Sequence, residues 1–225
     1  MPQRSRSRFA AMVELLPTTD VVADVGAGDL DLARLLLACG RAGRVIAIER
    51  AAGAHARAAR RAAADGRIEL RLGDGLEPVQ PREAGAAVIA GLGGRAIARV
   101  LRRAAEPGRG YVPPVVLAAP NADEMAALSA LAAAGLTLVA DRLVAEGARI
   151  RPIFLAMRRP SAEGRPDGRG EVLAPDAREC ANDADALRAA YAAERVTAWR
   201  RALAGSEGER AQALREAIAR LEARL

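Results

Sequence analysis

Residues 22–28 read Val-Ala-Asp-Val-Gly-Ala-Gly, an apolar run that ends in two glycines one residue apart. The helical pattern of Leu32, Leu35 and Leu36 follows shortly after. This order predicts a buried strand, a tight glycine turn and the N-terminus of a helix. In open α/β folds such a turn lies at the mouth of a parallel sheet, where the backbone can approach a bound nucleotide closely.

The residues beside this turn favour one kind of nucleotide over another. A dinucleotide-binding turn requires a third glycine three residues after the second, and this chain has Asp31 there. Carboxylates surround the turn instead, at Asp24, Asp29 and Asp31. They would repel a phosphate, but they suit a ligand that carries an ammonium and a sulfonium, as S-adenosylmethionine (SAM) does.

Two further strands are expected to end in acids at the same edge of the sheet. Residues 44–49 end in Glu49, about twenty residues beyond the glycine turn, where a carboxylate can reach ribose hydroxyls. Residues 68–72 run into a Gly-Asp-Gly turn, whose Asp74 could accept a hydrogen bond from an adenine amino group. An ordinary strand-end acid and a simple turn are the alternatives. Together the acids predict a nucleoside site.

The rest of the first two-thirds completes a sheet. A buried strand breaks into three glycines, a fifth strand ends in Pro-Asn, and an antiparallel pair closes the pattern. The strands and helices expected here cover residues 86–94, 96–105, 115–119, 123–134, 136–143 and 150–157. The predicted fold class is therefore α/β, with a Rossmann-like sheet.

The two ends of the chain differ from this central part. Residues 1–8 carry arginines among serines and read as a frayed tail or as an arm that touches phosphates, before a short helix over 9–16. After a domain over 1–159, residues 160–175 read as a Gly- and Pro-rich linker. Residues 176–225 show apolar spacing typical of an antiparallel coiled-coil hairpin, for RNA binding, packing or dimerisation.

Composition limits the classes of function. All 34 basic residues of the 225-residue chain are arginine, and 28 acids leave a net charge of +6. This charge suits a polyanionic partner, or reflects arginine replacing lysine in a GC-rich genome. The distant Cys39 and Cys180 argue against a disulfide framework, and we expect no metal site. No signal peptide or membrane span is recognisable, so we expect a cytoplasmic protein without a membrane partner; its oligomeric state stays open.

Three motifs resemble one family. Residues 89–94 (Ile-Ala-Gly-Leu-Gly-Gly), 119–121 (Ala-Pro-Asn) and 144–153 (Val-Ala-Glu-Gly-Ala-Arg-Ile-Arg-Pro-Ile) look like the bacterial tRNA (adenine(22)-N(1))-methyltransferases, the TrmK family. Its members carry an Ile-Ala-Gly-Met-Gly-Gly loop and a Gln-Pro-Asn turn in the same order. The resemblance spans essentially the whole chain and implies a class I methyltransferase that uses SAM, binds tRNA and methylates N1 of an adenine.

The resemblance and the strand-end acids together give the expected site. The cofactor would contact the tips of the first four strands, at Asp24, Val25, Gly26, Gly28, Glu49, Arg50, Asp74, Gly75 and Gly91. The methyl-transfer pocket would be lined by Gly91, Gly93, Gly94 and Asn121. The tRNA would be held by Pro120 and Asn121 and by the arginines nearest the mouth, Arg8, Arg95, Arg149 and Arg151.

The first loop departs from the family pattern. In the family this loop usually reads Asp-Ile-Gly-Ser-Asp-His-Ala-Tyr. In this chain Gly28, Asp29 and Asp31 replace the second Asp, the His and the Tyr of that pattern. This departure favours one alternative, a catalytically impaired Rossmann-like module that binds SAM or RNA. A small-molecule methyltransferase is a further alternative, and it predicts turnover that is indifferent to RNA.

Overall fold

The computed structural model of the chain describes residues 3–146 and 149–158, together with residues 197, 200 and 215. Residues 3–146 and 151–158 belong to one compact unit. Residues 197, 200 and 215 are helical, and the rest of the expected linker and coiled-coil hairpin lies outside the described residues. Both of those expectations, and the proposed domain boundaries, therefore stay predictions.

A seven-stranded sheet forms the centre of the unit, with the strand order β3-β2-β1-β4-β5-β7-β6. The strands are β1 (Thr19–Val25), β2 (Ala42–Glu49), β3 (Ile68–Leu72), β4 (Ala86–Ala90), β5 (Val115–Ala119), β6 (Leu136–Glu146) and β7 (Arg149–Arg158). The first five strands pair in parallel, and β7 pairs with β5 in the antiparallel direction. The order reverses between β1 and β4, and open α/β sheets bind ligands at this kind of switch point.

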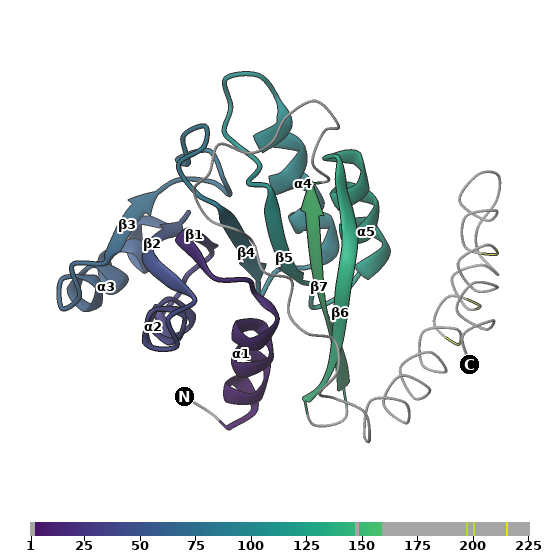
Figure 1. Cartoon of the computed structure of the whole chain (residues 1–225), viewed down its shortest axis with the longest axis horizontal. Helices are drawn as coiled ribbons and strands as arrows, with labels where there is room; N and C mark the ends of the chain where they lie inside the picture. The colour runs from purple at the N-terminus through teal and green to yellow at the C-terminus, as the bar shows by residue number, and fades with distance from the viewer. Residues whose placement is uncertain (1–2, 147–148, 159–196, 198–199, 201–214, 216–225) are drawn as a thin grey trace. The chain divides into compact units, whose positions relative to one another are not determined.

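Helices cover both faces of the sheet (Figure 1). They are α1 (Gln3–Leu15), α2 (Asp31–Ala38), α3 (Ala52–Ala62), α4 (Gly94–Ala105) and α5 (Glu124–Ala133). Apolar residues of α1, α2 and α3 pack on one face, and those of α4 and α5 pack on the other. Successive residues of a strand point to opposite faces of the sheet, so Val22 packs in the core beneath α1, α2 and α3, and Ala23 packs in the core beneath α4 and α5. The fold is a three-layer α/β/α sandwich.

The predicted α/β class and Rossmann-like sheet are confirmed, and the strands over 68–72 and 115–119 have the predicted bounds. The main difference is at the N-terminus, where residues 3–8 belong to α1 instead of forming a tail or arm. Burial of Met12 and Leu15 explains this, because docking of an apolar face stabilises a helix that its sequence alone would leave marginal. Within the described residues, no helix is both long and apolar enough to cross a bilayer.

Candidate functional site

The loop after β1 places backbone at the switch point of the sheet. Gly26 and Gly28 have φ angles of 76° and 54°, in the left-handed region that glycine adopts without steric cost. The Gly26 N–H donates to the carbonyl of Ile48 at 2.9 Å, which fastens the loop to β2. Leu30 also has a positive φ, of 64°, and its side chain is fully buried. Core packing therefore holds this loop in a conformation that a leucine rarely adopts.

Glu49 joins the tips of three neighbouring strands. Its Oε1 accepts a hydrogen bond from the Gly28 N–H, and its own carbonyl accepts one from the Gly73 N–H at 3.0 Å. The glutamate is buried at the carboxyl end of β2. The glycine turn and the strand-end acid Glu49 therefore touch directly, and the Glu49 side chain supports the loop.

Asp24 is a buried carboxylate at the end of β1. It is 3% exposed, and within the described part of the chain its Oδ2 has no hydrogen-bond partner. Burial, and to a smaller extent the nearby charge of Glu49, raises the pKa of Asp24 to about 7. A buried carboxylate oxygen without a partner is costly for the fold, so it indicates a place for a hydrogen-bond donor or a cation from a ligand.

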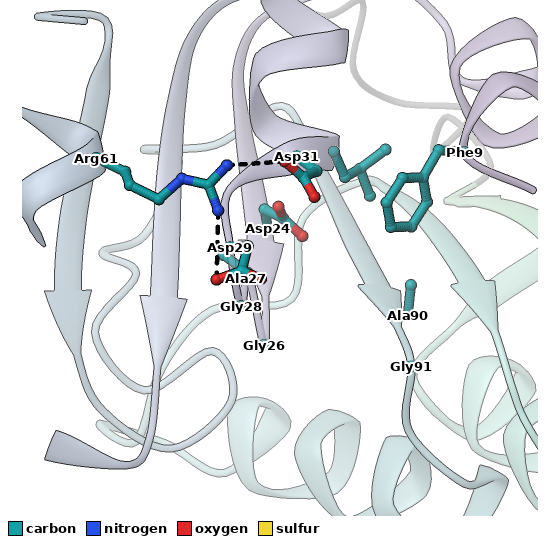
Figure 2. A pocket seen from close by; sticks show the side chains of 11 residues that line it. Phe9, Asp24, Gly26, Ala27, Gly28, Asp29, Asp31, Arg61, Ala90 and Gly91 are labelled. Atoms are coloured by element: carbon teal, nitrogen blue, oxygen red, sulfur yellow. Dashed lines mark hydrogen bonds and ion pairs between the residues drawn. The ribbon is translucent and has the colours of Figure 1, made fainter. Parts of the chain in front are cut away.

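A pocket of about 510 Å³ lies beside this carboxylate (Figure 2). Its lining comprises Phe9, Asp24, Gly26, Ala27, Gly28, Asp29, Asp31, Leu32, Arg61, Ala90 and Gly91. The pocket therefore extends between the tips of β1 and β4, and α1 contributes an aromatic wall through Phe9. Of the expected cofactor residues, it brings together Asp24, Gly26, Gly28 and Gly91.

Arg61 reaches the pocket from α3. Its guanidinium lies 3.3 Å from Oδ1 of Asp29 and 3.2 Å from Oδ1 of Asp31, as the dashed lines in Figure 2 mark. One arginine thus partly neutralises two of the acids that crowd the first loop. Asp24, on the same wall, remains outside this ion-pair cluster.

The loop after β4 is fastened to the turn after β5 through Asn121. The Asn121 Nδ2 donates to the Gly91 carbonyl at 2.8 Å, and its backbone N–H donates to the Leu92 carbonyl at 2.8 Å. The next contact is tighter, because a Cβ on Gly94 would lie 1.9 Å from the Asp123 carbonyl oxygen. Gly94 therefore lets the start of α4 approach the turn, and the predicted pocket residues Gly91 and Asn121 touch each other.

Two of the arginines expected to contact RNA are instead bonded to this turn, Arg8 fully buried and Arg151 partly buried. Arg8 is 7% exposed, and its guanidinium donates to Asn121 Oδ1 at 2.7 Å and to the Ala119 carbonyl at 2.6 Å. A weaker contact joins it to the carbonyl of the buried Pro120 at 3.3 Å. Arg151 donates to the Asn121 carbonyl, and both guanidiniums lie within 4 Å of Glu146. These contacts leave little of either side chain for phosphate.

The expected contacts at the tip of β3 are absent from the pocket lining. The Asp74 carboxylate lies 2.9 Å from Arg103 of α4, and the adjacent Gly75 packs against Val100 of the same helix. An adenine contact by Asp74 would require Arg103 to share the Asp74 carboxylate.

Two more of the expected cofactor residues lie outside the pocket lining. Val25 is buried in the core beneath α4 and α5, and Arg50 is exposed just after β2.

The remaining predicted positions lie at the surface. Arg95 has a side chain that is 77% exposed, 3.3 Å from Asp123, and Arg149 is exposed at the start of β7. Gly93 is the residue before α4, with open space where a Cβ would stand. Among the described residues, no group of three or more His, Cys, Asp or Glu side chains could hold a metal ion.

Sequence reasoning missed two walls of the pocket. Neither residue was expected at the site: Phe9 begins the short helix predicted over 9–16, and Arg61 lies in the last turn of α3. One signal was available for Phe9, since it is one of only two phenylalanines in the chain and follows an arginine directly. Nothing in the local sequence links Arg61 to Asp29 and Asp31, since their contact depends on how α3 packs beside the first loop.

The strand order, the reversed last strand and a pocket at the tips of β1 and β4 define a Rossmann-like methyltransferase fold. Residues 5–154 match the sequence model of the methyltransferase domain family, and the chain belongs to that family. The methyltransferase activity predicted from the motifs is thereby confirmed at the level of this family. A search of curated proteins finds no match to the chain.

Solved structures extend the likeness over the whole chain. The m1A22 tRNA methyltransferase TrmK of B. subtilis is 21% identical, with a TM-score of 0.69 over 96% of this chain and 97% of that one. A Streptococcus pneumoniae protein in complex with SAM is 22% identical, with a TM-score of 0.67 over 97% and 98%. M. capricolum TrmK in complex with S-adenosylhomocysteine is 15% identical, with a TM-score of 0.65 over 96% and 95%. At these identities the likeness shows a shared fold.

Proposed function

We propose that the protein is a SAM-dependent methyltransferase that methylates N1 of an adenine in tRNA. Asp24 is the observation that carries this proposal, because its buried carboxylate oxygen has no partner in the described residues and faces the pocket of a methyltransferase domain. The motifs over 89–94, 119–121 and 144–153 and the whole-chain likeness to TrmK structures support tRNA as the substrate.

The residues present fit SAM. Asp24 offers a buried acceptor to a cationic or hydroxyl group, and the glycine loop at Gly26 and Gly28 exposes backbone beside it. Glu49 has one carboxylate oxygen on the Gly28 N–H, so its second oxygen can accept a ribose hydroxyl. When bound, the cofactor supplies a methyl group that its sulfonium has already activated. Phe9 lines the same pocket and would help to exclude water from it when the cofactor is bound.

The chain's task in the reaction is alignment. N1 of an unpaired adenine carries its own lone pair, so no side chain has to remove a proton from it. Positioning alone can supply roughly 7–11 kcal/mol of such a barrier. The Gly91 loop follows β4 at the edge of the pocket, and Asn121, in the turn after β5, bonds to it, so the two can hold a flipped adenine by its edge. The absence of an acid–base pair among these residues fits this chemistry.

The charge at the surface fits a polyanionic substrate. Arg95 and Arg149 are exposed, and the whole chain carries a net charge of +6. Contacts of this kind hold RNA through its phosphates and its shape, with little dependence on sequence. A soluble enzyme of tRNA modification would act in the cytoplasm.

Two measurements test the proposal. Incubation with methyl-labelled SAM and an unmodified tRNA transcript should transfer label to the RNA, and nuclease digestion should release 1-methyladenosine. A transcript with guanine at position 22, the site named for the B. subtilis relative, tests the position. Binding of SAM without turnover would instead support the impaired module that the Asp29 and Asp31 loop favours. Turnover of small nucleosides with no requirement for RNA would support the small-molecule alternative.

A further inference from the structure

Arg8 connects helix α1 to the turn that carries Asn121. Its Nη1 donates to the side-chain oxygen of Asn121 at 2.7 Å, and its Nη2 donates to the Ala119 carbonyl at 2.6 Å. The two residues are 113 positions apart in the chain. The Arg8 side chain therefore links α1 to the carboxyl end of β5.

Arg8 is buried, so its guanidinium depends on these partners inside the protein. The residue is 7% exposed, and desolvation lowers its pKa, although the Glu146 carboxylate at 3.9 Å opposes that effect. Extracting a buried guanidinium toward a phosphate would leave Glu146 and the Ala119 carbonyl without this donor. Arg8 therefore serves the interior better than the RNA surface.

The contact also fixes which way the Asn121 amide points. Since Oδ1 accepts from Arg8, Nδ2 must face the other way, and it donates to the Gly91 carbonyl at 2.8 Å. A flipped amide would direct N–H groups at the guanidinium and an oxygen at the Gly91 carbonyl, with repulsion at both ends. Arg151 adds a bond to the Asn121 carbonyl and fixes the backbone of the turn.

We propose that Arg8 is a positioning residue: it holds the Asn121 amide with Nδ2 toward the Gly91 loop, and so fixes the wall against which the adenine is aligned. With Oδ1 bound to Arg8 and one Nδ2 hydrogen on the Gly91 carbonyl, the second Nδ2 hydrogen is what Asn121 can offer to an acceptor of the substrate. This inference rests on the proposed methyl transfer to adenine, and it replaces the expectation that Arg8 binds phosphate.

The kinetic test compares Arg8→Met, Arg8→Lys and Asn121→Ala with the exposed control Arg67→Met, whose arginine pairs with Asp65 before β3. Arg8→Met should lower kcat by about 100-fold, as a small misplacement of a reacting group does. The Kd for SAM and the Kd and salt dependence for tRNA should not change. Arg8→Lys keeps one donor and should recover part of kcat, and Arg67→Met should retain it.

The double variant tests whether Arg8 acts through Asn121. Adding Arg8→Met to Asn121→Ala should cause no further loss of kcat, because the acceptor has already been removed. Independent, additive losses would overturn the proposal, as would full kcat in Asn121→Ala. A weaker tRNA complex whose salt slope falls by about 1 would identify Arg8 as a phosphate contact instead. Weaker SAM binding would show that Arg8 only docks α1.

A spectroscopic readout separates this inference from the proposed function. In the wild-type protein the side-chain amide signals of Asn121, assigned by their loss in Asn121→Ala, should exchange slowly with solvent. In Arg8→Met they should exchange quickly and shift toward those of a free amide. Unchanged signals would overturn the proposal. If wild-type protein methylates no tRNA, the proposed function fails, and these signals still decide the role of Arg8.

Discussion

The carboxylate of Glu49 at the end of β2 accepts a hydrogen bond from the backbone N–H of Gly28 in the loop after β1. The acid thus supports the loop that lines the pocket, while Glu49 itself stands behind that lining, and we propose that its second oxygen accepts a hydroxyl of the ligand. Glu49 would thus have two roles, support of the loop and recognition of the ligand, and substitution of Glu49 tests the second.

Replacement of Glu49 should weaken SAM binding. Glu49→Ala removes the loop contact and a charged acceptor, and a loss of about 10- to 100-fold in affinity is expected from hydrogen bonds to a charged group. Glu49→Gln keeps one acceptor oxygen and should lose less. Isothermal titration calorimetry measures both, and equal affinity in all three proteins would refute the assignment.

The stability of the ligand-free protein should fall as pH rises through the range set by Asp24. Its pKa is raised by burial from 3.8 to about 7, so between these values the folded state binds more protons than the unfolded state. The free energy of unfolding therefore decreases with pH across this interval, by about 4 kcal/mol in total. Asp24→Asn should remove this decrease. Urea unfolding between pH 4 and pH 8 measures it, and a pH-independent difference from wild type would contradict the expectation.

The same carboxylate should make SAM affinity depend on pH. A cationic ligand favours the ionised form of Asp24, so binding in the wild-type protein should strengthen as pH rises toward and past about 7. Asp24→Asn should bind more weakly, with a flat profile between pH 6 and pH 8. Calorimetry in two buffers of different ionisation enthalpy would detect the accompanying proton release. An equally steep profile in Asp24→Asn would assign the titration to another group.

Adjacent glycines should differ sharply in their tolerance of a methyl group. A Cβ on Gly94 would lie 1.9 Å from the Asp123 carbonyl oxygen, whereas one on Gly93 would meet no atom within 4 Å. Gly94→Ala should therefore destabilise the protein by at least about 3 kcal/mol, because backbone must move apart. Gly93→Ala should leave the free energy of unfolding nearly unchanged. Chemical denaturation of the pair measures this, and similar losses would mean that the two turns are not packed as described.

Exposed arginines should control the salt dependence of tRNA binding. Arg95→Ala and Arg149→Ala should each weaken binding and reduce the slope of log Kd against log salt concentration by about 1. Filter binding over a range of salt concentrations gives the slope, with Arg67→Ala as the control far from the predicted mouth. A slope that neither substitution changes would place the RNA on another surface.

Local sequence patterns predicted much of this fold and part of the site. An apolar strand followed by glycines leaves few alternatives for the backbone, and β3 and β5 have the bounds that alternation and apolar runs indicate. The acids at Asp24 and Glu49 follow from the same logic, since parallel strands end at one edge. Asp74 satisfied that logic as well, but its partner Arg103 comes from a helix whose placement no local pattern gives.

The sequence by itself determined the α/β alternation, the glycine turns and the class of ligand, because these depend on residues close together along the chain. Only the tertiary structure decided that Arg8 and Arg151 turn inward to Asn121, and that Phe9 and Arg61 wall the pocket. The physical reason is that an arginine's role depends on its neighbours in space. A guanidinium serves a phosphate when exposed, and a buried one must find carbonyl and carboxylate partners within the fold.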